Sequence, residues 1–315
     1  MSERRFIIGA LLVLGVGALA PRVVTNAYVF YAGFVALQYV VIATAWNILG
    51  GYAGYVNFGS GGFVGLGTYA AIFLFNGLDA PLWVQILGAA FVGGLLGLGM
   101  GYLTLRIQGV YFSIATLALT TVLSTVIVNW NFVGGARGAT MLAAQPTVWF
   151  PSIVSYVFFA MLVLAVMSIA MARWIERSWI GRGLAALRAD ENAAECAGVP
   201  TLKLKLLAAT ISGALLATAG APYPYYASHV DPDSAFSINY ALNALAMPLI
   251  GGTRNWIGPL IGALLLSGVE QAATVTIPSE INLLIVGLVL ICFVVLAPDG
   301  LLGLAGRAIA LGKRS

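Results

Sequence analysis

Residues 152–172 read SIVSYVFFAMLVLAVMSIAMA, a run of 21 residues without one charged side chain. The run ends at Arg173, and a polar stretch then continues to residue 203 as RWIERSWIGRGLAALRADENAAECAGVPTLK. A bilayer core about 30 Å thick takes roughly 20 apolar residues in one helical crossing. This part of the sequence therefore predicts a membrane-spanning helix followed by a polar loop on one face of the membrane.

The composition of the whole chain is typical of a protein that lies in a lipid bilayer. Of the 315 residues, 61% are hydrophobic and 8% are charged, whereas a water-soluble domain carries roughly 25% charged residues. This composition excludes a soluble enzyme and predicts one transmembrane domain over residues 1–315. The net charge of +4 reflects the excess of Lys and Arg that membrane proteins carry on their cytoplasmic side. We therefore expect no nucleic-acid partner.

Two kinds of catalytic site are absent from the sequence. It contains no G-x-x-x-x-G-K-S/T motif, so the chain cannot hydrolyse ATP by the phosphate-loop route. One histidine, His229, and two distant cysteines, Cys196 and Cys292, cannot build a metal site or a redox pair unaided. We therefore expect no enzyme activity, no metal site and no cofactor.

Apolar runs bounded by charge, proline or polar clusters predict about ten membrane segments. The third segment is crowded with glycine and the eighth has only about 14 residues, which is typical of a broken or re-entrant piece. The expected fold class is an all-α polytopic integral membrane protein with eight to ten transmembrane helices and at least one broken or re-entrant segment. The ten segments are 6–20, 28–48, 51–76, 82–105, 110–130, 152–172, 204–227, 238–251, 256–274 and 281–298.

The orientation follows from the basic residues, because cytoplasmic loops hold the excess of Lys and Arg. With the N-terminus inside and all ten segments crossing, the outer side keeps only Arg22 and Arg137. Both termini are therefore expected to be cytoplasmic, as is the loop 173–203. The inner side then holds Arg4, Arg5, Arg106, Arg173, Arg177, Arg182, Arg188, Lys203, Lys205, Arg254, Arg307, Lys313 and Arg314.

The first segment has two interpretations. Arg4 and Arg5, a short apolar run and the sequence Ala-Leu-Ala at residues 18–20 are similar to a cleavable signal peptide. Pro21 directly after that site disfavours cleavage, so an uncleaved first helix is the favoured interpretation. The orientation of the remaining segments is the same in both cases.

Residues 50–62 read GGYAGYVNFGSGG, in a chain with 38 glycines. Small residues allow helices in lipid to pack closely, but glycine at this density also weakens a helix by up to about 1 kcal/mol per residue. Non-helical backbone at membrane depth is tolerated where it is buried in protein or lines a water-filled cavity. The run therefore indicates either tight helix packing or a bent segment that lines a translocation route.

Polar residues inside the segments are the candidates for a substrate pathway. Most intramembrane hydroxyls and amides are interhelical contacts worth about 0.6 kcal/mol each, but a carboxylate in a span, here Glu270, is a functional candidate by default. Glu270 is close to the end of its segment, so a structural role also stays open. The candidate pathway residues are Asn47, Gly54, Asn57, Ser60, Thr116, Thr121, Asn129, Asn243 and Glu270.

Within the polar loop, residues 184–197 are rich in Ala, Leu, Glu and Arg and predict one short amphipathic helix. Gly198 and Pro200 supply its end. Such a helix could lie in the lipid headgroup layer, which would need a basic polar face. Because its face carries mixed charges and its back is lined with alanine, docking into a groove of a partner protein is favoured.

Several blocks of the sequence, in this order, resemble the M-type permease subunits of ABC importers for branched-chain amino acids. The resemblance runs from about residue 47 to residue 303. The blocks are 46–54 (WNILGGYAG), 65–69 (GLGTY), 111–119 (YFSIATLAL), 129–130 (NW), 134–138 (GGARG), 187–195 (LRADENAAE) with Gly198, 251–252 (GG), 258–259 (GP) and 297–301 (APDGL).

The resemblance implies an importer half in the bacterial inner membrane that moves branched-chain amino acids by ATP-driven alternating access. It implies an H-type partner permease, two cytoplasmic ATPase subunits and a periplasmic substrate-binding protein. Loop 173–203 would couple to the ATPases, with Ala193, Ala194 and Gly198 as contacts. The implied coupling residues are Arg182, Leu187, Arg188, Asp190, Glu191, Ala193, Ala194, Glu195 and Gly198.

Two positions depart from the family pattern. Members often carry His where this chain has Ser60 and Glu where it has Thr121, and both departures remove an ionisable group. The same fold could therefore import urea, short amides or another small acid. A rival of another class is an ion-coupled secondary transporter, which would need carboxylates at mid-membrane, and a channel is a further rival.

Overall fold

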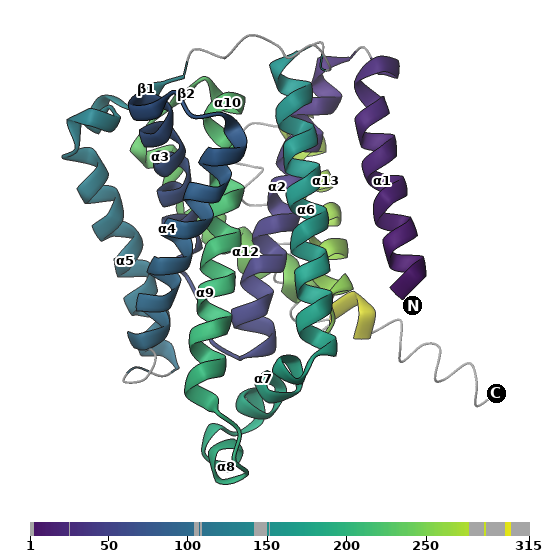
Figure 1. The fold of residues 1–315 in the computed structure, drawn as a ribbon, viewed down its shortest axis with the longest axis vertical. Coiled ribbons are helices and arrows are strands. Elements are labelled where there is room, and N and C mark those ends of the chain that lie inside the picture. The colour runs from purple at the N-terminus through teal and green to yellow at the C-terminus, as the bar shows by residue number, and fades with distance from the viewer. Residues whose placement is uncertain are drawn as a thin grey trace.

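The computed structural model describes residues 3–24, 26–103, 107, 109–141, 150, 152–276, 287 and 300–303. Within them, long helices stand side by side in a bundle (Figure 1). These are α1 (Glu3–Val23), α2 (Ala27–Asn47), α3 (Ser60–Leu78), α4 (Leu82–Leu103), α5 (Val110–Val128), α6 (Ile153–Arg177), α9 (Thr201–Gly220), α12 (Ile238–Gly251) and α13 (Ile257–Thr276).

Short elements mark the two ends of the bundle. At one end, called here the ribbon end, β1 (Ala139–Thr140) pairs antiparallel with β2 (His229–Val230). At the other, the loop end, α7 (Trp179–Ala189) and α8 (Glu191–Cys196) project below the long helices (Figure 1). The remaining short elements are the π-helical turn η1 (Ile48–Tyr52), the 3₁₀ turns η2 (Asn131–Val133) and η3 (Gly135–Arg137), α10 (Tyr223–Ala227) and α11 (Pro232–Ala235).

The expected fold class is confirmed. In the described part of the chain, seven helical stretches are long and apolar enough to cross a membrane: Glu3–Val23, Ala27–Tyr52, Ser60–Leu78, Leu82–Leu103, Val110–Val128, Ile153–Arg177 and Thr201–Ala227. Large apolar side chains such as Leu12 of α1 and Phe91 of α4 are exposed on the outside of the bundle. Lipid tails are as apolar as these side chains, so their exposure is compatible with a bilayer.

Glycine allows close contact between α4 and α9. A Cβ atom on Gly97 would lie 2.4 Å from the carbonyl oxygen of Ala209, and one on Gly93 would lie 2.6 Å from that of Gly213. No side chain fits at such a distance from a backbone carbonyl. Since gains from packing hold helices together in lipid, these glycines fix the position of α9 in the bundle.

The third predicted segment, 51–76, is broken. Helix α3 begins only at Ser60, and residues 53–59 lie outside the helices. Glycine serves close packing here as well, because a Cβ on Gly61 would lie 2.6 Å from the carbonyl oxygen of Ser237. Both interpretations of the glycine run thus apply to its structure, a bend and tight packing; whether the bend lines a translocation route stays a prediction.

The eighth predicted segment, 238–251, coincides with α12. Its 14 residues span about 21 Å at 1.5 Å per residue, which is less than a bilayer core. Residues 221–237, which include α10, β2 and α11, complete the path toward the ribbon end. Phe236 in this connection stacks on Tyr69 of α3 with ring centroids 5.9 Å apart, so the segment is an interrupted one.

The single helix predicted over 184–197 is wrong, because the structure contains two helices separated at Asp190. This residue is extended (φ −162°, ψ 117°), and its carboxylate accepts a hydrogen bond from the amide of Ala193 at 2.9 Å. Aspartate in this position satisfies an amide that a helix N-terminus leaves unpaired. The cap at Asp190 therefore starts a new helix, although the flanking alanines and leucines favour one continuous helix.

The two ends of the bundle carry different charge. Arg22 and Arg137 lie toward the ribbon end, at the last turn of α1 and in η3, whereas the other described basic residues lie toward the loop end. This division agrees with the one expected from the sequence, but the side of the membrane stays a prediction. Segment 281–298 apart from Gly287, and Cys292, Arg106, Arg307, Lys313 and Arg314, lie outside the described residues.

Candidate functional site

The loop end is built on an apolar stripe of α7. Ile180, Leu184 and Leu187 recur at spacings of four and three and are buried against the bundle. Ala194 of α8 is buried as well, with 5% of its surface exposed. Leu187 and Ala194, both expected from the sequence to be coupling residues, therefore support the two short helices from inside.

Away from this stripe, many residues of α7 and α8 are exposed. Four exposed alanines, called here the alanine row, lie before and after the break at Asp190: Ala185, Ala189, Ala193 and Ala197. Ala185 and Ala189 also line a cavity beside Tyr52. The coupling candidates that are exposed together with Ala193 are Arg182, Arg188, Asp190, Glu195 and Gly198. Small side chains in a row leave a shallow surface against which another protein element can pack closely.

Arg188 connects α7 to the broken segment. Its guanidinium donates a hydrogen bond to the carbonyl oxygen of Gly51. The Arg188 side chain also lies against Gly54, which has a φ of +84°. A Cβ atom placed on Gly54 would lie 3.2 Å from Cγ of Arg188. Glycine is favoured at position 54 because the backbone conformation is strained for other residues and a Cβ would press against the Arg188 side chain.

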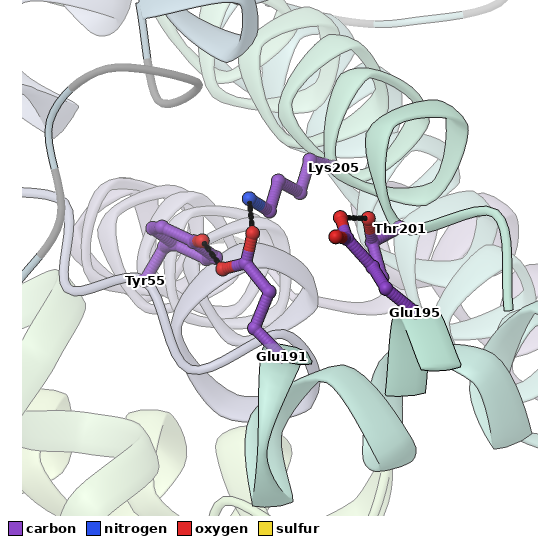
Figure 2. A network of polar contacts seen from close by, with 5 residues as sticks. All are labelled: Tyr55, Glu191, Glu195, Thr201 and Lys205. Atoms are coloured by element: carbon purple, nitrogen blue, oxygen red, sulfur yellow. Dashed lines mark hydrogen bonds and ion pairs between the residues drawn. The ribbon is translucent and has the colours of Figure 1, made fainter. Parts of the chain in front are cut away.

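A second connection uses Glu191 at the start of α8 (Figure 2). One carboxylate oxygen, Oε2, accepts a hydrogen bond from the hydroxyl of Tyr55 at 2.7 Å, and the other forms an ion pair with Nζ of Lys205 on α9. The Lys205 side chain is only 4% exposed and that of Glu191 23%. Burial, and then the hydrogen bond to Glu191, raise the pKa of Tyr55, so its hydroxyl remains a donor at physiological pH.

Glu195, one turn further along α8, binds the start of the next helix. Its carboxylate accepts a hydrogen bond from the hydroxyl of Thr201, the first residue of α9 (Figure 2). Glu191 and Glu195 thus both face the N-terminal part of α9. A carboxylate near a helix N-terminus is also favoured by the helix dipole.

Glu176, near the end of α6, forms a third polar connection at the loop end. Its Oε2 atom accepts hydrogen bonds from the amide of Trp256 at 2.7 Å and from the hydroxyl of Tyr52 at 3.4 Å. Tyr52, Tyr55, Glu176 and Lys205 are not among the functional residues expected from the sequence. Lys205 gave a usable signal, since a lysine inside predicted segment 204–227 needs an acidic partner.

Two cavities of about 520 Å³ each flank residues 51–56. The first lies between Tyr52, Glu176 and α7 and is lined by three arginines, Arg182, Arg188 and Arg254. The second lies between the segment 53–58 and the start of α5, and is lined by Tyr55, Ser113 and Glu191 among others. The loop end of the broken segment therefore has free space on both sides.

Five of the nine pathway candidates gather at the break before α3. Gly54 lies in it, and the other four, Asn47, Asn57, Ser60 and Thr116, are buried around it. Thr116 accepts a hydrogen bond from the amide of Phe58 at 3.1 Å, and Oδ1 of Asn57 accepts one from the amide of Gly59 at 2.7 Å. These side chains stabilise the non-helical backbone within this chain, as membrane depth requires.

Two more candidates lie on the outer face of α5. Thr121 and Asn129 are exposed there together with Thr125. Their polar groups bond along the helix: Thr125 donates to the carbonyl oxygen of Thr121 and Asn129 to that of Thr125, both at 2.8 Å. A polar face on a transmembrane helix is more typical of a helix contact or a watery passage than of contact with lipid.

The last two candidates form a separate group. Asn243 of α12 is buried, and Glu270 of α13 is half-buried. Glu270 interacts with Asn243 and with Tyr39 of α2. The structure therefore does not bring Glu270 together with the break or with the exposed face of α5.

Comparison with known proteins gives one family match and several relatives. Residues 28–294 match the model of the family described as branched-chain amino acid transport system / permease component. The high-affinity branched-chain amino acid transport system permease protein LivM of Salmonella typhimurium is 26% identical over 95% of this chain and 75% of its own length. LivM of Escherichia coli K12 is 26% identical over 96% of this chain and 75% of its own length.

The corresponding LivH protein of Salmonella typhimurium is more distant. It is 23% identical over 84% of this chain and 91% of its own length. The similarity to LivM thus extends over more of this chain than the similarity to LivH, as the M-type resemblance of the sequence blocks predicts.

Proposed function

Because this chain belongs to the family of branched-chain amino acid transport system permease components, we propose that it is one membrane-spanning half of an ABC importer for branched-chain amino acids in a bacterial inner membrane. The similarity to the LivM permeases of branched-chain amino acid transport supports the substrate class. The observation that carries the proposal is the loop end, where two short helices are held against the broken segment and turn a row of alanines outward.

The motor in this proposal is a pair of ATPase subunits that bind the loop end from the cytoplasm. The exposed row of Ala185, Ala189, Ala193 and Ala197 suits close packing against another protein, and the neighbouring cavity with Arg182 and Arg254 suits an acidic rim. The concentration of described basic residues at this end supports its cytoplasmic side. A periplasmic substrate-binding protein would then deliver the solute at the ribbon end.

The passage in this proposal lies along α5 and is completed by an H-type partner permease. The exposed polar face with Thr121 and Asn129 supports this, because the described part of this chain leaves it uncovered and polar groups are disfavoured against lipid. The similarity to both LivM and LivH proteins also fits a pair of related permeases. Alternating access would follow from movement of α5 and of the break before α3 relative to the partner.

The test is uptake by proteoliposomes that contain this chain, the partner permease, the ATPases and the binding protein. Ala193→Arg should abolish ATP-driven leucine uptake, because a long charged side chain would stand where the ATPase packs, while Ala193→Ser should retain it. The amount of inserted, folded permease should stay unchanged in both variants. Normal uptake by Ala193→Arg would contradict docking on this surface.

A matched variant separates docking from folding. Ala194 is buried next to Ala193, so Ala194→Arg should reduce the amount of folded permease, not only its coupling. Uptake by this chain alone, driven by an ion gradient without ATP, would instead favour a secondary transporter. If the binding protein bound urea or short amides and did not bind leucine, the substrates would be small polar solutes and not branched-chain amino acids.

A further inference from the structure

One carboxylate at the loop end joins three separate parts of the chain. Glu191 belongs to α8, and it binds Lys205 of α9 and Tyr55 of the broken segment at the same time (Figure 2). Nζ of Lys205 also lies 5.4 Å from the centre of the Tyr55 ring, within the range of a cation–π interaction. Hydrogen bonds to ionised groups are directional and roughly twice as strong as neutral ones.

Tyr55 continues this connection to α5. Its ring packs edge-on against Phe112, with centroids 5.6 Å apart and an interplanar angle of 85°. The residue after Tyr55, Val56, accepts a hydrogen bond from the hydroxyl of Ser113 at 2.8 Å. Phe58 donates its amide to Thr116, as described above. The segment 55–58 is therefore attached to the first two turns of α5 at three successive places.

The hydrogen bond from Arg188 of α7 also reaches the broken segment, but it ends at Gly51, before the residues that contact α5. The remaining contacts of α7 and α8 are of a different kind. The buried side chains of Leu184 and Leu187 pack without directional bonds, and such contacts can slide when a helix shifts. The bond between Glu195 and Thr201 stays within the junction of α8 and α9 and does not reach the broken segment. Glu191 of α8 reaches the segment before α3 through its hydrogen bond with Tyr55.

We propose that Tyr55, Glu191 and Lys205 form a joint that transmits movement of α8 to the broken segment and to α5. The proposal rests on the proposed function, because it assumes that ATPases move α8. Tyr55, Glu191 and Lys205 act in it as positioning residues: they touch no substrate, and they set how far α5 follows the loop end. If movement passes through this joint, the number of solute molecules imported per ATP hydrolysed depends on the hydroxyl of Tyr55, which binds Glu191.

The test variant is Tyr55→Phe, because it removes the hydroxyl and leaves both the ring on Phe112 and the ion pair of Glu191 with Lys205. In the reconstituted assembly, we expect ATP hydrolysis near the wild-type rate and a loss of leucine imported per ATP of about tenfold, the equivalent of one hydrogen bond to a charged group. Loss of stability alone would lower hydrolysis and import together and would leave their ratio unchanged.

Tyr225→Phe is the matched control. Tyr225 accepts a hydrogen bond from the side chain of Gln85 at 2.7 Å, far from the loop end, so the same chemical change there should leave the ratio at the wild-type value. Ser113→Ala provides a second variant, because it cuts the attachment of Val56 to α5 and should lower the ratio in the same direction even if Tyr55→Phe reduces the yield.

The outcomes separate this proposal from the proposed function. An unchanged ratio in both Tyr55→Phe and Ser113→Ala, measured on an assembly that imports leucine with ATP, would overturn the joint and leave the importer intact. An equal fall of the ratio in Tyr225→Phe would also overturn it. A wild-type assembly that imports nothing with ATP would instead contradict the proposed function itself.

Discussion

Gly54 illustrates how a single residue makes the loop end possible. Its φ of +84° is a conformation that side chains disfavour, and Arg188 occupies the space where a Cβ would point. The same arginine donates to the carbonyl oxygen of Gly51. The backbone of the broken segment therefore lies directly against α7, which a larger residue at position 54 would prevent.

We expect Gly54→Ala to destabilise the permease more than Gly198→Ala does. Gly198 has nearly the same φ, +80°, but open space around its Cβ position, so its replacement carries only the backbone cost of roughly 1–2 kcal/mol. Gly54→Ala adds the contact with Arg188. Thermal unfolding of both variants in detergent measures the difference, and equal midpoints would contradict the close approach of Arg188.

At the scale of the element, α4 and α9 form a pair that depends on which side of α4 carries glycine. Gly97 faces the backbone of Ala209, whereas a Cβ on Gly99, on the same helix, would meet nothing within 4 Å. Gly97→Leu should therefore prevent normal packing and reduce the yield of folded protein severely. Gly99→Leu is the control and should leave the yield near that of the wild type; equal losses would contradict this helix interface.

Helix α8 is short enough for its cap to matter. Asp190→Ala removes the acceptor for the amide of Ala193 and should cost about 1 kcal/mol of local stability. Because 1.4 kcal/mol corresponds to a factor of ten, amide hydrogen exchange at residues 191–197 should become about fivefold faster. Asp190→Asn keeps an acceptor and should exchange like the wild type. Unchanged exchange in Asp190→Ala would mean that α8 does not depend on this cap.

The sequence predicts elements well where apolar runs have sharp polar limits. Segment 238–251 coincides with α12, and the glycine run around Gly54 correctly indicates a break before α3. Prediction from the sequence fails where one side chain determines the local backbone conformation. The cap at Asp190 divides residues 184–197 into two helices, although their helix propensity favours one. The joint of Tyr55 and Lys205 connects residues far apart in the chain, so no local pattern contains it.

At the scale of the whole molecule, the orientation of the chain in the membrane can be measured by cysteine labelling. Cys196 is exposed at the loop end, and Cys292→Ser removes the other cysteine of the sequence. We expect a membrane-impermeant maleimide to label Cys196 in inverted membrane vesicles and not in intact right-side-out vesicles or spheroplasts. Labelling from the periplasmic side would reverse the orientation inferred from the basic residues.

The central claim is that an external ATPase binds the alanine row at the loop end of this chain. It is tested most directly by the rate at which maleimide labels a cysteine introduced by Ala193→Cys, with Cys196 and Cys292 replaced by serine. The account predicts that labelling slows by at least about tenfold when the ATPase subunits are bound and recovers when they are removed. An equal labelling rate with and without bound ATPases would contradict the account.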